Sequence, residues 1–184
     1  MDSKQQTNTE NASQLKPKPV GLAGVVAITA YLIFFSISLL YSFMKSWPSP
    51  TNEASITILV WKFSVSEEVR LIFLVILAGA LGSRVHTLRS ISWYIGNRTL
   101  VWSWLARYIL TPFVGSTLSL VFYFVLRGGL FSPTATVDQT SPFGFVGIAA
   151  MVGMFTEQAV LKLKDVADTL FTKPKSGADA KPQE

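Results

Sequence analysis

The chain has 184 residues, of which 49% are hydrophobic and only 15% charged, whereas soluble globular proteins are about 25% charged. With a mean hydropathy of +0.40, this composition excludes an ordinary water-soluble domain and favours a membrane protein. The absence of cysteine excludes disulfides, thiolate metal sites and cysteine nucleophiles, and a single histidine, His86, excludes a paired-histidine zinc motif. We therefore predict no catalytic residue, no cofactor and no metal site.

The first apolar stretch follows a polar segment. Residues 1–18 are rich in Gln, Asn, Ser, Thr and Lys, which predicts a disordered tail. From Pro19 to Met44 no residue is charged, which exceeds the roughly 20 residues that a membrane helix needs. A cleaved signal peptide is the alternative, but its apolar region would be shorter and would end in a small-residue cleavage site. We predict a retained first span over residues 20–44.

Residues 55–66 mix β-branched and aromatic side chains. This pattern fits either a short strand or an amphipathic segment at the membrane interface, and the sequence does not decide between them. Ser64 followed by Glu67 resembles a capping box, which predicts that the next helix begins near residue 65 with Glu67 and Glu68 in its first turn. The second span is predicted over residues 67–90, with helical pitch continuing to a stop at Gly96-Asn97.

The last two spans lie in the C-terminal half of the chain. Nineteen uncharged residues separate Arg107 from Arg127 and predict a third span over 104–126, kinked at Pro112. A Gly- and Ala-rich stretch predicts a fourth span over 143–160. No helix breaker follows it, so we expect the same helix to continue as an amphipathic cytoplasmic helix over 157–171, before a disordered tail, 172–184. The predicted fold is an all-α, polytopic membrane domain, 19–171, with four transmembrane helices.

The basic residues predict how the chain is oriented. Twelve of the 16 lysines and arginines fall in the two tails, in the C-terminal helix and in the connection between spans two and three. Because cytoplasmic segments of membrane proteins are enriched in these residues, both termini are expected in the cytoplasm.

Three arginines in that connection, Arg84, Arg89 and Arg98, lie near Trp and Tyr residues. In a soluble protein such a cluster would suggest nucleic acid. In a membrane protein, anionic lipid headgroups are the simpler partner. We expect these arginines to contact membrane lipids, and we expect no nucleic-acid partner.

Small residues recur at helical spacing in three spans. They make up a set of candidate helix-packing or pore-lining residues: Gly79, Gly82, Gly115, Gly144, Gly147, Ala150 and Gly153. Such residues allow the backbones of membrane helices to approach closely, more often within one bundle than in a dedicated dimer motif. The fourth span is too weakly apolar to face lipid all round, so we expect it in the bundle interior, at a subunit interface or along a water-filled path.

Two ionisable residues, Arg107 and Glu157, are predicted at the inner edge of spans three and four. They could form an ion pair, or each could simply mark the membrane interface. None of the acidic residues lies in the middle of a span, which argues against a proton-coupled antiporter.

Several short motifs carry a resemblance: Gly96-Asn97-Arg98, Trp102-Ser103-Trp104, Leu126 to Phe131, Pro142-Phe143-Gly144, Gly153-Met154-Phe155 and Glu157 to Lys164. Over residues 84–171 the chain resembles a group of uncharacterised bacterial integral membrane proteins. The resemblance implies a bacterial inner-membrane location and carries over no catalytic residue.

The function expected from the sequence is therefore non-enzymatic. The first hypothesis is a homo-oligomeric membrane protein with a pore through span four. The alternative is a membrane anchor or accessory subunit that recruits a cytoplasmic protein partner through helix 157–171. An intramembrane enzyme or small transporter is the least favoured, because the usual catalytic side chains are absent from the spans.

Overall fold

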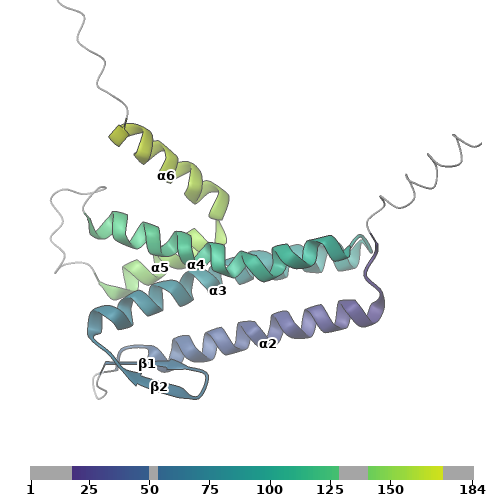
Figure 1. The fold of residues 1–184 in the computed structure, drawn as a ribbon, viewed down its shortest axis with the longest axis horizontal. Helices are drawn as coiled ribbons and strands as arrows, with labels where there is room; N and C mark the ends of the chain where they lie inside the picture. Colours follow the sequence, from purple (N-terminus) through teal and green to yellow (C-terminus); the bar gives the residue numbers. More distant parts are fainter. Residues whose placement is uncertain (1–17, 50–53, 129–140, 172–184) are drawn as a thin grey trace, which may run out of the picture.

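The computed structural model describes residues 18–49, 54–128 and 141–171 (Figure 1). Within these ranges the regular secondary structure is helical apart from one β-hairpin and an isolated bridge between Pro19 and Val101. The predicted tails, 1–18 and 172–184, lie almost entirely outside the described residues. The elements in chain order are α2 (Leu22–Ser46), β1 (Ser55–Ile58), β2 (Trp61–Ser64), α3 (Glu67–Gly96), η1 (Trp102–Trp104), α4 (Leu105–Arg127), α5 (Pro142–Met154) and α6 (Thr156–Phe171).

Three helical segments of the described chain are long and apolar enough to cross a membrane: Leu22–Ser46, Glu67–Gly96 and Trp102–Arg127. The count rises to four if the bent pair α5 and α6 forms one span. These helices support the prediction of a multi-pass, all-α membrane protein. They fit the first three predicted spans, and the second helix extends to Gly96 as its pitch indicated.

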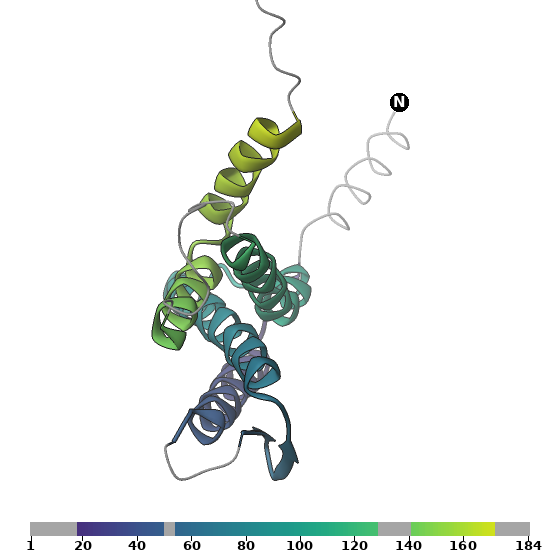
Figure 2. The ribbon, with the colours of Figure 1, turned by 90° about the vertical axis from the view of Figure 1, so that its left-hand side faces the viewer.

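Helix α3 is the central element of the bundle. It packs against α2 on one side and against both α4 and α5 on the other, and the end-on view shows α2 separated from α4 and α5 by α3 (Figure 2). Its buried residues include a continuous run of small side chains from Ala78 to Ala80, followed by Gly82 and Ser83. Small residues on several sides of one helix allow it to take three helical neighbours.

At one end of the bundle, which we call the turn end, α2 begins, α3 ends and α4 begins. The chain before α2 is tied to the chain before α4, because Val20 N–H donates to Leu100 O at 2.9 Å and Trp102 N–H donates to Lys18 O at 3.2 Å. Apolar side chains of these three helices and of the connection between α3 and η1 close this end, among them Ile28, Leu32, Ile91, Leu100 and Tyr108.

The opposite end, which we call the hairpin end, carries β1 and β2. They pair antiparallel, with Ser55 opposite Ser64 and Ile58 opposite Trp61. The structure therefore resolves the open alternative for this segment in favour of strands. The hairpin is attached to α2 because the backbone N–H of Thr57 donates to Ser46 Oγ at 2.8 Å.

The N-terminus of α3 differs from the prediction by two residues. Ser66, not Ser64, caps the helix, with its side chain accepting from the backbone N–H of Val69. Ser64 is the last residue of β2 and pairs with Ser55, so it is engaged in the sheet. Glu67 and Glu68 do lie in the first turn of α3 as predicted, where they oppose the positive end of the helix dipole.

The expected continuous helix from the fourth span into the C-terminal helix is wrong. The chain bends by 109° between α5 and α6, at Phe155, whose φ of −115° and ψ of 49° are not helical. The bend brings Ala159 of α6 into a buried cluster with Phe122 of α4 and Val152 of α5. No proline lies at this break, but Gly153 is two residues before it, and the tertiary contact of Ala159 holds α6 in the bent position.

Candidate functional site

The candidate site begins where α3, α4 and α5 cross, near the middle of α3. A Cβ atom at Gly82 would overlap the carbonyl oxygen of Ala150, and one at Gly153 would overlap the carbonyl oxygen of Gly79. A Cβ atom at Gly115 of α4 would also come too close to the carbonyl oxygen of Gly79, at 2.8 Å. The helices can approach this closely only because these positions have no side chain.

Two hydroxyl groups bridge the helices at the same crossing. Ser119 Oγ of α4 donates to Ala149 O of α5 at 2.8 Å, and Ser116 Oγ donates to Ile76 O of α3 at 3.0 Å. Such interhelical hydrogen bonds are worth about 0.6 kcal/mol each in membrane proteins. The first joins α4 to α5 and the second joins α4 to α3.

Two of the predicted packing residues lie elsewhere. Gly144 and Gly147 are exposed, and no atom of the described chain outside their own neighbourhood lies within 4 Å of an added Cβ. They are on the face of α5 that also exposes Ile148 and Met151. They do not pack within the bundle, because the buried face of α5 is formed by Phe145, Val146, Ala149, Val152 and Gly153. A contact with a second copy and a pore-lining position stay open for both.

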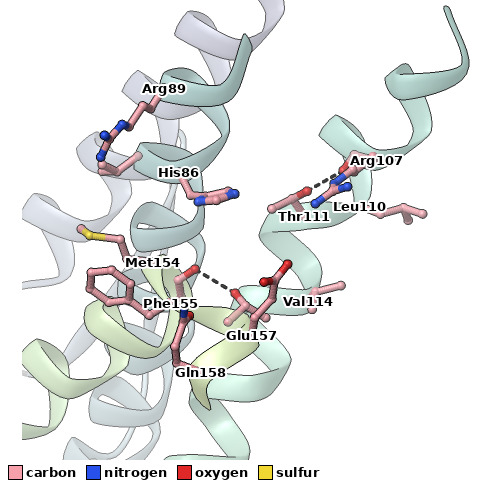
Figure 3. Close-up of a pocket in the computed structure, with 13 residues that line it drawn as sticks. His86, Arg89, Arg107, Leu110, Thr111, Val114, Met154, Phe155, Glu157 and Gln158 are labelled. Carbon is pink, nitrogen blue, oxygen red and sulfur yellow. Dashed lines mark hydrogen bonds between the residues drawn. The ribbon is translucent and has the colours of Figure 1, made fainter. Parts of the chain in front are cut away.

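Because α5 ends at the crossing, the space beyond it toward the turn end is not filled by a helix. A pocket of about 620 Å³ lies there. Its walls come from residues 85–89 of α3, residues 107–114 of α4 and the bend, 153–158. We call it the bend pocket (Figure 3).

Ionisable side chains gather in the bend pocket. His86 reaches from α3 toward α4, where Arg107 and Thr111 lie, and Glu157 extends into the same space from the start of α6 (Figure 3). Arg89 lines the pocket one turn from His86, on the side of Met154 and Phe155. The structure thus brings together Arg107 and Glu157, which the sequence placed on the same side of the membrane.

Of the two readings left open for Arg107 and Glu157, the ion pair is not formed among the described residues. The described part of the chain contains two ion pairs, Arg70 with Glu67 and Arg127 with Glu68, and both lie at the hairpin end. The Arg107 guanidinium lies instead over the Trp104 ring, 5.2 Å from its centroid. His86, Arg89, Glu157 and Gln158 make no side-chain hydrogen bond or ion pair within the described residues.

We expected Arg84 to contact lipid headgroups, but it is buried in the bundle at 1% exposure. Its Nη1 donates to the Tyr108 carbonyl oxygen at 3.5 Å, while Nε and Nη2 have no acceptor among the described residues. The expectation failed because α2 packs over this position. Arg89 and Arg98 are exposed, in agreement with a surface position.

Sequence reasoning did not find the other polar residues of the bend pocket, which are His86, Thr111, Thr156 and Gln158. The spacing contained one usable signal, because His86 with Arg89 and Arg107 with Thr111 are three and four residues apart and so share a helix face. The spacing does not show that these faces of α3 and α4 line the same pocket, because the pocket exists only where α5 ends.

No protein-family model, curated protein or solved structure was found to match this sequence. The resemblance to bacterial integral membrane proteins over residues 84–171 therefore stays a prediction. The fold and the bend pocket are therefore inferred from this chain alone.

Proposed function

We propose that the protein is a non-enzymatic, homo-oligomeric membrane protein in which the broken α5–α6 pair lines a polar path at the subunit interface. The observation that carries this proposal is the position of the 109° bend. It follows the crossing of α5 with Gly82, which is about halfway along α3. If α3 spans the bilayer, α6 therefore leaves the bundle near mid-membrane depth.

Such a position is incompatible with lipid around α6. The helix carries five charged residues, Glu157, Lys162, Lys164, Asp165 and Asp168, and only Ala159 among its residues is buried. Each charge at the centre of a bilayer costs about 2.5–3.5 kcal/mol even on insertion-based scales. Helix ends at membrane depth are tolerated only where protein or water covers them. A second copy of the chain, together with water, would provide that environment.

The exposed face of α5 supports the same proposal. Gly144 and Gly147 leave a shallow surface between Ile148, 40% exposed, and Met151, 61% exposed. Small residues next to larger apolar ones are typical of surfaces where membrane helices pack closely. This face is therefore our proposed contact between copies.

The proposed orientation follows from the basic residues. The turn end, near Arg89, Arg98 and Arg107, would face the cytoplasm together with the start of α2. The 109° bend directs α6 back toward the hairpin end (Figure 1), so a cytoplasmic C-terminus is proposed from the lysines of the C-terminal region alone. The bend pocket would then open from the cytoplasmic half of the membrane. A bacterial inner membrane is the proposed location.

Site-specific cross-linking tests the subunit interface. Because the chain contains no cysteine, Met151→Cys introduces a single thiol on the exposed face of α5. Ile37→Cys is a matched control, since Ile37 is 60% exposed on α2 and Met151 is 61% exposed. We expect oxidation in membranes to give a covalent dimer of Met151→Cys and not of Ile37→Cys. A strictly monomeric protein by native mass spectrometry would overturn the proposal.

Conductance tests the polar path. Purified protein in planar bilayers should carry current, and Gly147→Leu should reduce it, because the larger side chain separates copies at the α5 face. If the protein forms a dimer but the bilayers carry no current, the proposed assembly stands and the proposed polar path is refuted.

A second candidate function is a membrane anchor that recruits a cytoplasmic protein through α6. The exposed apolar residues Leu161, Leu170 and Phe171, which are 62%, 54% and 85% exposed, favour it. Deletion of residues 157–171 should then remove a partner from pull-downs, whereas unchanged partners would refute it.

A further inference from the structure

The β-hairpin has one apolar and one polar face. Residues paired across two strands share a face, and successive pairs alternate between the two faces of a sheet. The observed register therefore places two apolar pairs on one face, Ile56–Phe63 and Ile58–Trp61, and two polar pairs on the other, Ser55–Ser64 and Thr57–Lys62. Ile58, Trp61 and Phe63 are 44%, 68% and 47% exposed. The described chain thus leaves most of the apolar face uncovered.

Two serine hydroxyls of α2 hold the hairpin along the helix. The backbone N–H of Thr57 donates to Ser46 Oγ at 2.8 Å. The backbone N–H of Leu59 donates to Ser42 Oγ at 3.4 Å. Two residues of a strand and four residues of a helix both advance by about 6–7 Å, so the spacing of the donors matches that of the acceptors. The hairpin therefore runs from the end of α2 back along its last turn, with its own turn directed toward the middle of the bundle (Figure 1).

This attachment determines the level of the hairpin turn along α2. The helix has 25 residues and so is about 37 Å long, whereas the hydrocarbon core of a bilayer is about 30 Å thick. If α2 is centred in the bilayer, about two or three residues at each end reach the headgroups. Ser42 lies four residues before the end of α2. The hairpin turn is therefore level with the boundary between the headgroups and the hydrocarbon.

The surroundings of the turn fit that level. Leu40, Tyr41 and Met44 of α2 are 51%, 47% and 65% exposed there, so the apolar face of the hairpin continues the lipid-facing surface of a membrane span. Lys45 and Lys62 are also exposed, and long lysine side chains can reach the headgroups from this depth. Backbone N–H groups without acceptors are costly next to hydrocarbon, and the two serines supply acceptors for two of them.

We propose that the β-hairpin is an interfacial anchor whose apolar face inserts among the lipid acyl chains at the hairpin end of the bundle. Trp61 lies at the level where tryptophan is enriched in membrane proteins, and Lys62 on the opposite face meets the headgroups. The occupant of the apolar face is lipid, because the adjoining surface of α2 is itself a membrane surface. The proposal requires α2 to cross a membrane, and it is independent of the oligomeric state and of the side that the hairpin end faces.

The experiment measures the depth of single nitroxide labels on the full chain in phosphatidylcholine vesicles. Because the chain contains no cysteine, Phe63→Cys, Lys62→Cys and Ile37→Cys each accept one label. The first two are adjacent residues on opposite faces of the hairpin, and Ile37 is a reference that is 60% exposed on α2. Relaxation of the label by oxygen, which concentrates in hydrocarbon, is compared with relaxation by a water-soluble nickel chelate.

We expect the ratio of oxygen to nickel accessibility at residue 63 to approach the ratio at residue 37 and to exceed that at residue 62 severalfold. Equal nickel accessibility at residues 62 and 63 would overturn the proposal. A label at residue 63 that neither reagent reaches would show that protein, such as a second copy of the chain, covers the apolar face. That result would also overturn the proposal.

The role of the two serines is tested in the Phe63→Cys background. Ser42→Ala together with Ser46→Ala removes both acceptors, so the two hairpin N–H groups must find water. We expect nickel accessibility at residue 63 to rise by about fivefold or more, the effect of losing two weak hydrogen bonds. Ser38→Ala is the control, because its hydroxyl donates within its own helix. Equal accessibility in the two backgrounds would overturn the inference that the serines set the depth of the hairpin. Thermal unfolding in detergent excludes misfolded variants from the comparison.

Discussion

The guanidinium carbon of Arg84 lies 4.5 Å from the centroid of the Phe35 ring, and it is also 5.8 Å from the Tyr31 ring centroid. Both rings belong to α2, so this buried cation links α2 to α3. A desolvated cation–π contact is worth about 2 kcal/mol, whereas each buried donor without an acceptor costs about 1–3 kcal/mol. The rings therefore offset a large part of the cost of burying Arg84.

Replacing the Phe35 ring tests this contact. Phe35→Leu keeps an apolar side chain but removes the aromatic face, and we expect the free energy of unfolding in detergent to fall by about 1–2 kcal/mol. Phe34→Leu, at a position that is 70% exposed, should have little effect. In the Arg84→Met background the effect of Phe35→Leu should shrink, because the cation is gone. An unchanged effect in that background would contradict the cation–π assignment.

The helix crossing predicts a contrast between two glycines of similar sequence context. Gly82→Ala places a Cβ onto the carbonyl of Ala150, so α5 must move away, and we expect a loss of about 1–3 kcal/mol in unfolding free energy. Gly147→Ala meets open space and should be neutral or stabilise by up to about 1 kcal/mol, since alanine favours helix. Thermal unfolding in detergent measures both. Equal losses would mean that α3 and α5 do not approach as described.

A third prediction concerns the hydrogen bond from Ser119 to the α5 backbone. Ser119→Ala removes an interhelical hydrogen bond of 2.8 Å in a buried position, and we expect a cost of about 0.6–1.7 kcal/mol. Ser38→Ala is the control, because the Ser38 hydroxyl donates to Phe34 O within its own helix. Hydrogen exchange of residues 145–153 should increase in the first variant and not in the second. Identical exchange in the two variants would argue against the bridge.

The hairpin turn supplies a fourth prediction. Leu59 has a φ of 54°, a left-handed conformation that costs a non-glycine residue about 1–2 kcal/mol. Leu59→Gly should therefore slow hydrogen exchange across β1 and β2 by stabilising the turn. Val60→Gly adds backbone freedom without relieving a positive φ, so it should speed exchange. Faster exchange in Leu59→Gly would show that the Leu59 side chain matters more than its backbone strain.

At the hairpin end, the ion pair between Arg127 and Glu68, 3.0 Å apart, should contribute little. Glu68 is 58% exposed, and exposed pairs are typically worth less than about 1 kcal/mol. We expect Glu68→Gln to change the unfolding free energy by a few tenths of a kcal/mol. A larger, salt-dependent loss would indicate that the pair is shielded from water.

Sequence alone determined the class of the molecule and most of its helices. Long uncharged segments with charged residues at both ends predict membrane helices, because a helix needs about 20 apolar residues to cross the bilayer. The C-terminal end of α3 followed from the stop signal at Gly96, whereas its N-terminal cap lies two residues after the Ser64 that the sequence indicated. The uncharged stretch between Arg107 and Arg127 predicted α4, a single helix that contains Pro112. Small residues also marked the crossing, since Gly79, Gly82 and Gly115 do lie where helices touch.

Only the tertiary structure decided which of these residues face one another. Arg84 and Arg89 are five residues apart, yet one is buried under α2 and the other lines the bend pocket. The break at Phe155 depends on the packing of Ala159 against Phe122, a contact between residues 37 positions apart in the chain. The sequence of one segment predicts that it is helical and which residues share a face. Neighbouring helices determine which face is buried and where a helix breaks, and the contacts with them are nonlocal.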